Sequence, residues 1–255
     1  MIPRKIHYCW FGGKPLPKSA VRCINSWKKH FPGWEIIEWN ESNFDIDAIP
    51  YTREAASAGK WAFVSDYARF LILYHHGGVY FDTDVEVIRP MEDLIEKGAF
   101  MGFEKSINGV GVASGLGISA PIKHPFYHEV INLYSKLHYT DENGIPYPVT
   151  VVAHITNLLL EHGLKLENTR QHIAGIDIYP NDYFNPLDDA TGVLKVTPNT
   201  RSIHHYAKTW CDNYGPVRTF VMRRLHRLFG VTFLSRLKAI LLRAIPGNNK
   251  TTTRP

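Results

Sequence analysis

The chain is poor in cysteine and has no long apolar run. Its three cysteines, Cys9, Cys23 and Cys211, are scattered among 255 residues, which argues against a disulfide framework or a cysteine-based zinc site. No run of about 18 apolar residues is present, so no spanning helix is expected. Residues 1–8 lack the apolar core of a signal peptide. Together these absences predict a cytoplasmic protein with reduced thiols.

Acidic residues are missing from the last part of the sequence. Residues 216–255 contain nine Lys plus Arg and no Asp or Glu. The 29 basic residues of the whole chain less these nine leave 20, against 24 acidic residues in residues 1–215, a formal charge of −4. The net charge of +5 therefore belongs to the tail. Such asymmetry indicates an acidic partner.

Basic and apolar residues alternate at near-helical spacing in this tail. We expect residues 216–246 to form basic amphipathic helices that bind an anionic membrane surface, followed by a disordered tail over residues 247–255. Packing of a C-terminal helix on the core is the alternative. No recognition module accompanies the charge, so nucleic acid is not an expected partner.

Strands and helices alternate from the start of the chain. Residues 60–76 carry apolar side chains at helical spacing, and Gly77 is a natural helix end. Residues 107–117 are rich in glycine and small residues and predict a loop that approaches a ligand closely. The pattern predicts an α/β sheet protein with one large domain over residues 1–215. One strand is expected to follow Gly77 and to lead into Asp82. The other expected strands are residues 5–11, 34–39, 85–88, 99–104, 176–179 and 202–206, and the other helices are residues 19–30, 91–97, 126–137 and 151–162.

The most informative residues are Asp82 and Asp84, which follow an apolar strand. Side chains of extended backbone alternate faces, so both carboxylates can point the same way. Two hard oxygen ligands suit Mg²⁺ or Mn²⁺, which takes further ligands from phosphate groups and water. Taken alone, a motif of this kind is more often a polar turn after a strand.

Three other residues are candidates for the same pocket. Asp66 and Arg69 lie three residues apart on one helix face. They form either a surface ion pair or a donor-and-acceptor pair for a sugar nucleotide at the carboxyl end of the sheet. Trp10 ends the first strand beside two glycines and is either a core aromatic or a stacking face for a nucleobase.

The segment of residues 203–210 contains a pair of histidines. One neutral imidazole there would complete a metal site, and Lys208 would meet a phosphate. A structural or solvent-facing His pair is the alternative.

Taken together, residues 2–13, 65–69 and 74–84 resemble the glycosyltransferase sugar-binding region that contains the Asp-x-Asp motif, of the family 32 type. The resemblance covers about residues 2–125. It implies a GT-A fold, which is a single Rossmann-like nucleotide-sugar-binding domain with a mixed central sheet flanked by helices. It also implies a UDP- or GDP-linked sugar donor, Mn²⁺ or Mg²⁺ and retention of anomeric configuration.

The resemblance also implies roles for individual residues. Asp66 and Arg69 would contact the donor sugar and ribose, Asp82 would lie near the ribose and the metal, and Asp84 would bind the metal directly. His205 would be a further metal ligand, with His204 as the alternative. The remaining donor-binding residues would be Trp10 on the base, Lys208 on the diphosphate, and Trp210. Asp82, Asp84 and Arg69 are thus the expected catalytic residues.

The expected activity is transfer of a hexose or N-acetylhexosamine to a saccharide acceptor of capsule, exopolysaccharide or lipopolysaccharide synthesis. A lipid-linked acceptor would suit a protein bound peripherally to the inner face of the cell membrane. Glu104 and Asn108 are candidate contacts to sugar or acceptor, or ordinary surface residues. Two other functions compete: a haloacid-dehalogenase-like phosphatase that uses Asp82 and Asp84, and a noncatalytic glycan- or membrane-binding module.

Overall fold

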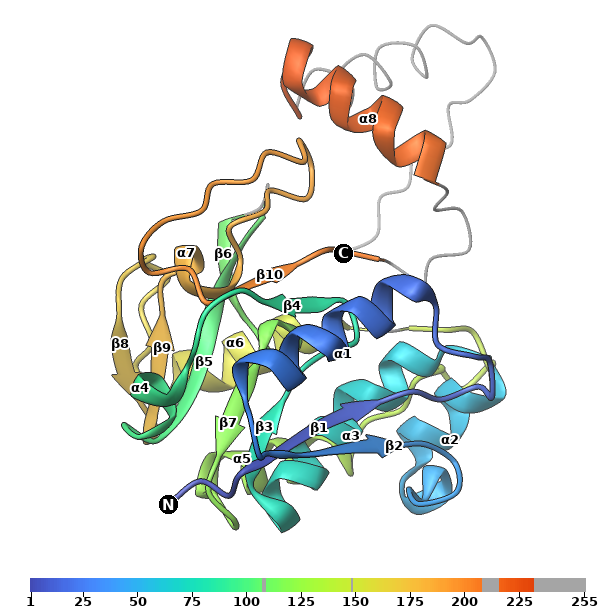
Figure 1. Ribbon diagram of the computed structural model, residues 1–255. Helices are drawn as coiled ribbons and strands as arrows, with labels where there is room; N and C mark the ends of the chain where they lie inside the picture. Colours follow the sequence, from blue (N-terminus) through green and yellow to red (C-terminus); the bar gives the residue numbers. More distant parts are fainter. Residues whose placement is uncertain (107–108, 148, 208–215, 232–255) are drawn as a thin grey trace, which may run out of the picture.

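A mixed sheet forms the centre of the protein (Figure 1). The computed structural model describes residues 1–106, 109–147, 149–207 and 216–231. Strand order in the sheet is β2-β1-β3-β7-β5-β9-β8, with β6 paired to β5. The strands β2, β1 and β3 are parallel, as are β5 and β9, whereas β7 is antiparallel to β3 and β5. The strands are β1 (Lys5–Cys9), β2 (Glu35–Trp39), β3 (Gly78–Tyr80), β5 (Ala99–Ser106), β6 (Gly109–Ala113), β7 (Ile118–Ala120), β8 (Gln171–Ile173) and β9 (Ile176–Tyr179).

Helices cover both faces of the sheet and bury two apolar cores. One core lies between the sheet and α1, whose Trp27 is fully buried; the other lies under α3, α5 and α6. Because strand side chains alternate, the neighbouring residues Tyr8 and Cys9 of β1 enter different cores. The helices are α1 (Lys18–His30), α2 (Pro50–Ser57), α3 (Trp61–His76), α4 (Glu92–Ile95), α5 (Pro125–Tyr134), α6 (Val151–Glu161), α7 (Asn181–Phe184) and α8 (Pro216–Phe229), with short 3₁₀ turns η1 (Ile46–Ala48) and η2 (Ser114–Leu116).

A second, two-stranded sheet pairs β4 (Val85–Val87) with β10 (Ser202–His204) in antiparallel fashion. Helix α1 holds this sheet through two hydrogen bonds to β4. The indole Nε1 of Trp27 donates to the Val85 carbonyl oxygen at 2.7 Å, and the Val87 amide donates to Ser26 Oγ at 2.9 Å. Strand β4, which follows the turn after β3, is therefore fixed at both of its ends.

The predicted fold class is confirmed: the chain is α/β, with a mixed central sheet flanked by helices, as expected of a GT-A fold. The loop predicted over residues 107–117 was wrong, because it contains strand β6. Alternate Gly and Val fit the two-residue period of a strand, and Gly111 lets it pack closely, since a Cβ there would lie 2.9 Å from Val152. The sequence also did not predict α2, α7, β7 or β8.

Part of the predicted basic tail is described. Helix α8 lies at its start, and residues 232–255 lie outside the described residues. Among the residues that the structure describes, no helix is both long enough and apolar enough to cross a membrane.

Candidate active site

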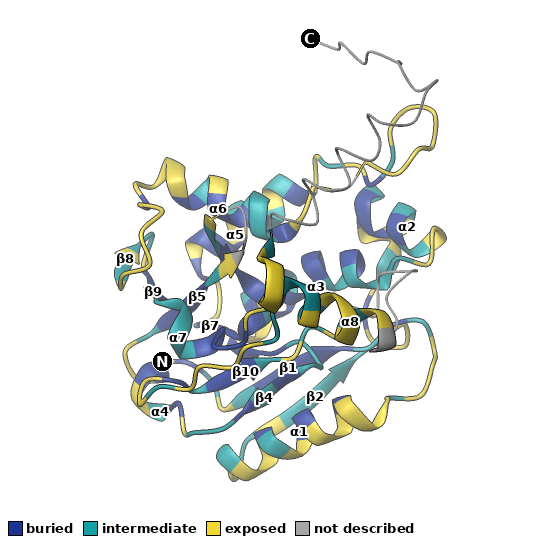
Figure 2. Cartoon of the chain, turned by 90° about the horizontal axis from the view of Figure 1, so that it is seen from above, coloured by how far each residue is buried: buried dark blue, intermediate teal, exposed yellow. Residues whose placement is uncertain are grey.

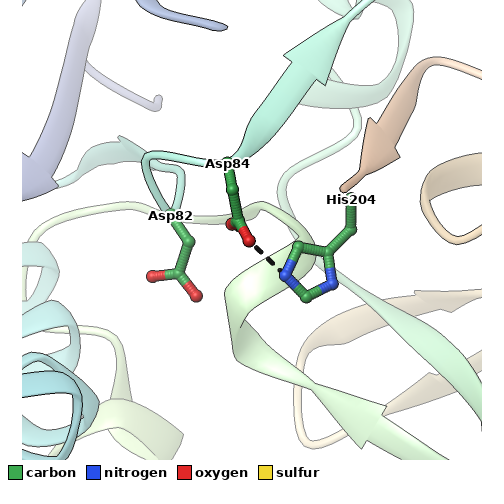
Figure 3. A group of neighbouring side chains, drawn as sticks. All are labelled: Asp82, Asp84 and His204. Carbon is green, nitrogen blue, oxygen red and sulfur yellow. Dashed lines mark ion pairs between the residues drawn. The ribbon is translucent and has the colours of Figure 1, made fainter. Parts of the chain in front are cut away.

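Asp82 and Asp84 lie in the turn between β3 and β4, and Figure 3 shows both carboxylates beside the ring of His204. Backbone hydrogen bonds fix the turn. The Asp82 amide donates to the Gly115 carbonyl at 3.4 Å, and the Val85 amide donates to the Asp82 carbonyl at 3.0 Å. The two carboxylates lie on one side of the turn, as predicted, with oxygen atoms within 4.8 Å of each other.

One buried guanidinium joins helix α3 to this turn. Arg69 is 3% exposed, and its Nη2 lies 2.9 Å from Asp66 Oδ1 and 3.1 Å from Asp82 Oδ1. Its Nη1 donates to Ser114 Oγ at 2.9 Å. Because Asp66 and Arg69 are buried, they are not the surface ion pair that the sequence left open. Arg69 fixes the position of the first motif aspartate.

Burial sets the protonation of this network. Loss of water raises the pKa of Asp66 to about 7, although the charge of Arg69 opposes the rise. Burial also raises the pKa of Asp82, again against the effect of Arg69, and the charge of Asp84 adds to the rise. One arginine thus faces two carboxyl groups that are costly to ionise together.

His204 comes next to Asp84 through strand pairing. In the β4–β10 sheet, His204 lies opposite Val85, and its Nε2 is 3.3 Å from Asp84 Oδ1 (Figure 3). Asp84 Oδ2 also accepts from the Ala207 amide at 2.8 Å. Burial by itself raises the pKa of Asp84, but His204 and the Ala207 amide outweigh it and bring the pKa to about 2. Likewise, burial lowers the pKa of His204, but Asp84 outweighs it and brings the pKa to about 9.

The neighbouring histidine, His205, does not join this cluster, which corrects the preferred choice of ligand. Successive side chains of extended backbone point to opposite sides. The Nε2 of His205 accordingly lies 2.8 Å from Glu86 Oε2, and the side chains of both residues are 44% exposed. The alternative residue, His204, therefore replaces His205 in the candidate ligand set.

Asp82, Asp84 and His204 fit a divalent metal ion. Each offers one ligand atom, and these atoms lie within 4.8 Å of one another; no other such group of three is found among the described residues. The Nδ1 atom of His204 is buried without a hydrogen-bond partner. Two carboxylate oxygens and one imidazole suit Mn²⁺ and, less closely, Mg²⁺. His204 would have to release its proton to become a ligand.

The cluster opens into a cavity of about 690 Å³, a size that accommodates a nucleotide-sized ligand. Trp10, Asp66 and Arg69 line it, so the structure brings these predicted donor-binding residues together with both aspartates. The indole Nε1 of Trp10 donates to the Lys14 carbonyl at 2.5 Å. Other residues that line the cavity include Trp61, Glu104, Gly115, Val151, Asp189 and Tyr206.

Sequence reasoning missed Tyr206, whose hydroxyl donates to Glu104 Oε1 at 3.3 Å and accepts from Asn185 Nδ2 at 2.5 Å. Its ring centroid is 4.2 Å from that of His204. No local pattern marks Tyr206, because its partners come from distant segments. The predicted contacts Lys208, Trp210 and Asn108 lie outside the described residues, so their roles stay predictions.

Comparison with known proteins bears on the resemblance to the Asp-x-Asp glycosyltransferases. Residues 17–101 match the family described as "Glycosyltransferase sugar-binding region containing DXD motif". The resemblance found in the sequence is thereby confirmed over residues 17–101.

Two curated yeast proteins are among the relatives. The chain is 31% identical over 149 residues to "Inositol phosphoceramide mannosyltransferase 1" of Schizosaccharomyces pombe. The aligned region covers 54% of the chain and 44% of the relative. It is 30% identical over 191 residues to "Mannosyl phosphorylinositol ceramide synthase CSH1" of Saccharomyces cerevisiae. Here the aligned region covers 72% of the chain and 49% of the relative. The chain thus spans about half the length of these relatives.

Solved structures with some likeness include two glycosyltransferases. "PaToxG Glycosyltransferase" has a TM-score of 0.47 at 16% identity, with 63% of this chain and 69% of that chain covered. The galactosyltransferase LgtC with donor and acceptor sugar analogues has a TM-score of 0.41 at 14% identity, with 86% and 95% covered.

Proposed function

We propose that the protein is a metal-dependent, retaining glycosyltransferase that moves a hexosyl or N-acetylhexosaminyl group from a nucleoside diphosphate sugar to a saccharide hydroxyl. One observation carries the proposal: Asp82, Asp84 and His204 converge on the same cavity as Trp10 and the Asp66–Arg69 pair. A phosphatase or a simple glycan-binding module needs no such combination of metal ligands, aromatic face and buried guanidinium.

In this proposal the acceptor oxygen forms a bond to the anomeric carbon while the bond from that carbon to the diphosphate oxygen breaks. The acceptor proton passes to the departing diphosphate, as retention by attack on the same face requires. Asp82, Asp84 and His204 would hold Mn²⁺ or Mg²⁺, which supplies positive charge beside the diphosphate. Arg69 fixes Asp82, and Trp10 offers a face to the base.

The donor sugar we would test first is mannose, because the two yeast relatives carry mannosyltransferase or mannosyl-synthase names. Those names also mention an inositol phosphoceramide, which presents polyol hydroxyls on a lipid. We propose a lipid-linked saccharide or polyol head group as the acceptor. Capsule, exopolysaccharide and lipopolysaccharide precursors belong to this class.

Release of nucleoside diphosphate tests the proposal. Purified protein is incubated with UDP- and GDP-sugars, with Mn²⁺, with Mg²⁺ or with EDTA, in the presence of saccharide and inositol phospholipid acceptors. We expect metal-dependent release from one nucleotide class, loss of release in EDTA, and a product whose anomeric configuration by NMR equals that of the donor.

Three results would contradict parts of this proposal. Release of inorganic phosphate from an aryl phosphate, without turnover of any sugar nucleotide, would favour the phosphatase. Glycan binding without turnover would favour the binding module. An inverted anomeric configuration would remove the retaining mechanism but leave the transferase.

A further inference from the structure

Helix α8 is held on the protein by its basic side chains. It contacts the segment of residues 187–197, which we call the docking loop. Arg223 Nε donates to the Asp189 carbonyl at 3.1 Å, and Arg227 Nε donates to the Thr191 carbonyl at 2.6 Å. His226 Nδ1 lies 2.9 Å from the Ala190 carbonyl oxygen. Helices of soluble proteins usually turn their apolar side inward, so this arrangement is reversed.

Because the basic side of α8 faces the protein, apolar side chains remain exposed on both α8 and the docking loop. Eight of the sixteen exposed large apolar side chains of the described residues belong to α8 or the docking loop. Leu228, at 75% exposed, is among the most exposed of them, and Figure 2 shows α8 coloured mostly as exposed. The eight are Val193, Leu194, Val196, Phe220, Val221, Met222, Leu228 and Phe229. An exposed apolar patch of this kind marks a contact surface.

Charge identifies what covers this surface. The segment of residues 216–255 has nine basic and no acidic residues. Exposed cations stand next to the apolar side chains: the Arg224 guanidinium lies 5.1 Å from the centre of the Phe220 ring, and Lys195 is exposed between Leu194 and Val196. Apolar groups flanked by cations suit the head-group region of an anionic bilayer. A second copy of the chain would instead bring two basic segments together.

We propose that α8 and the docking loop form one composite surface that binds a bilayer containing anionic lipids. This binding follows from the surface alone, whereas its use in catalysis rests on the proposed function. Asp189 belongs to the docking loop, lines the cavity and accepts from Arg223. The bilayer therefore lies beside the cavity, where a lipid-linked acceptor is within reach. Peripheral attachment at the inner face of the cell membrane is the corresponding location.

Vesicle co-sedimentation of the full chain tests the composite surface. The vesicles are phosphatidylcholine alone and phosphatidylcholine mixed with phosphatidylglycerol. Two variants remove apolar groups: Phe220→Gln with Leu228→Gln in the helix, and Leu194→Gln with Val196→Gln in the docking loop. Ile122→Gln with Leu166→Gln is the matched control, because these side chains are 51% and 52% exposed elsewhere on the molecule.

We expect binding to the anionic vesicles only. The affinity should fall about tenfold or more in the helix variant and about threefold or more in the loop variant, because each removes exposed apolar groups from the interface. The control should bind as the unchanged chain does. Thermal unfolding should stay unchanged in all three, since every altered side chain is exposed.

Four outcomes would overturn the proposal. An unchanged loop variant would reduce the surface to the tail alone, and equal binding to neutral vesicles would remove the role of charge. Absence of binding to anionic vesicles would remove the bilayer. Dimers in size-exclusion chromatography that the helix variant dissociates would assign the surface to a second copy. Nucleoside diphosphate release is also measured for the same variants with a water-soluble acceptor. Normal release together with lost vesicle binding concerns the surface alone, whereas no release from the unchanged chain concerns the proposed chemistry.

Discussion

The cavity has two walls of different origin. Trp10, Asp66, Arg69 and the motif aspartates come from residues 9–84, about a third of the chain. The buried Arg69 joins Asp66 to Asp82. The lining residues outside this segment come from β5, β6, η2, the start of α6, the docking loop and residues 204–207. Local spacing defines the first wall, whereas pairing between distant segments defines the second. The two walls should therefore respond differently to substitution.

The largest effect is expected at the motif itself. Asp82→Ala with Asp84→Ala removes both carboxylate ligands and should lower kcat by about 10³-fold or more at saturating metal, because the diphosphate loses its counter-charge. Asp45→Ala with Asp47→Ala is the matched control, since these residues form a second Asp-x-Asp motif on an exposed turn. Comparable losses in both double variants, measured by nucleoside diphosphate release, would contradict a special role for the first.

Arg69 is the next strongest point of the first wall. Arg69→Met leaves Asp66 and Asp82 buried without their shared cation, and should reduce the free energy of unfolding by about 3–5 kcal/mol. Arg170→Met removes a half-exposed guanidinium from the buried Asp177. Because Asp177 keeps His172 Nδ1 at 3.1 Å, the free energy of unfolding should fall by about 1 kcal/mol or less. Denaturant unfolding compares the two. Equal losses would mean that the buried network does not hold the wall together.

Alanine substitution of the two consecutive histidines tests which residue of the second wall binds the metal. His204→Ala should weaken Mn²⁺ binding by about tenfold to a hundredfold, because it removes a ligand candidate beside Asp84. His205→Ala, which loses only the exposed contact to Glu86, should change it by less than about twofold. Isothermal titration with Mn²⁺ measures both. The reverse ranking would restore His205 as the ligand.

The smallest effect is expected from alanine substitution of a glycine at the point where the two walls meet. A Cβ at Gly115 would lie 2.2 Å from Asp82 Oδ2, whereas one at Gly111 would crowd Val152 and Thr156. Both Gly→Ala variants should lose about 1–3 kcal/mol of stability through overpacking. Only Gly115→Ala should also weaken Mn²⁺ binding, by about fivefold, since it displaces a ligand. Equal metal affinity in the two variants would place Asp82 outside the metal site.

Much of the first wall was predictable because its residues obey short-range rules. Strand alternation predicted Asp82 and Asp84 on one side, an arrangement that the turn between β3 and β4 in fact provides. Helical spacing predicted Asp66 beside Arg69. The second wall was not predictable, because the choice between His204 and His205 depends on the β4–β10 register. A shift of one residue exchanges their faces. Tyr206 gave no local pattern, and the glycine-rich strand β6 read as a loop.

Pairing of β4 with β10 also has a consequence for how the protein is made. Asp84 is synthesised about 120 residues before His204, which completes the cluster. On the ribosome, the two aspartates therefore emerge well before the imidazole that completes the cluster. Proteolytic cleavage before residue 202 would likewise leave the aspartates without their imidazole. The pairing thus restricts the completed site to chains that have been translated and folded past residue 204.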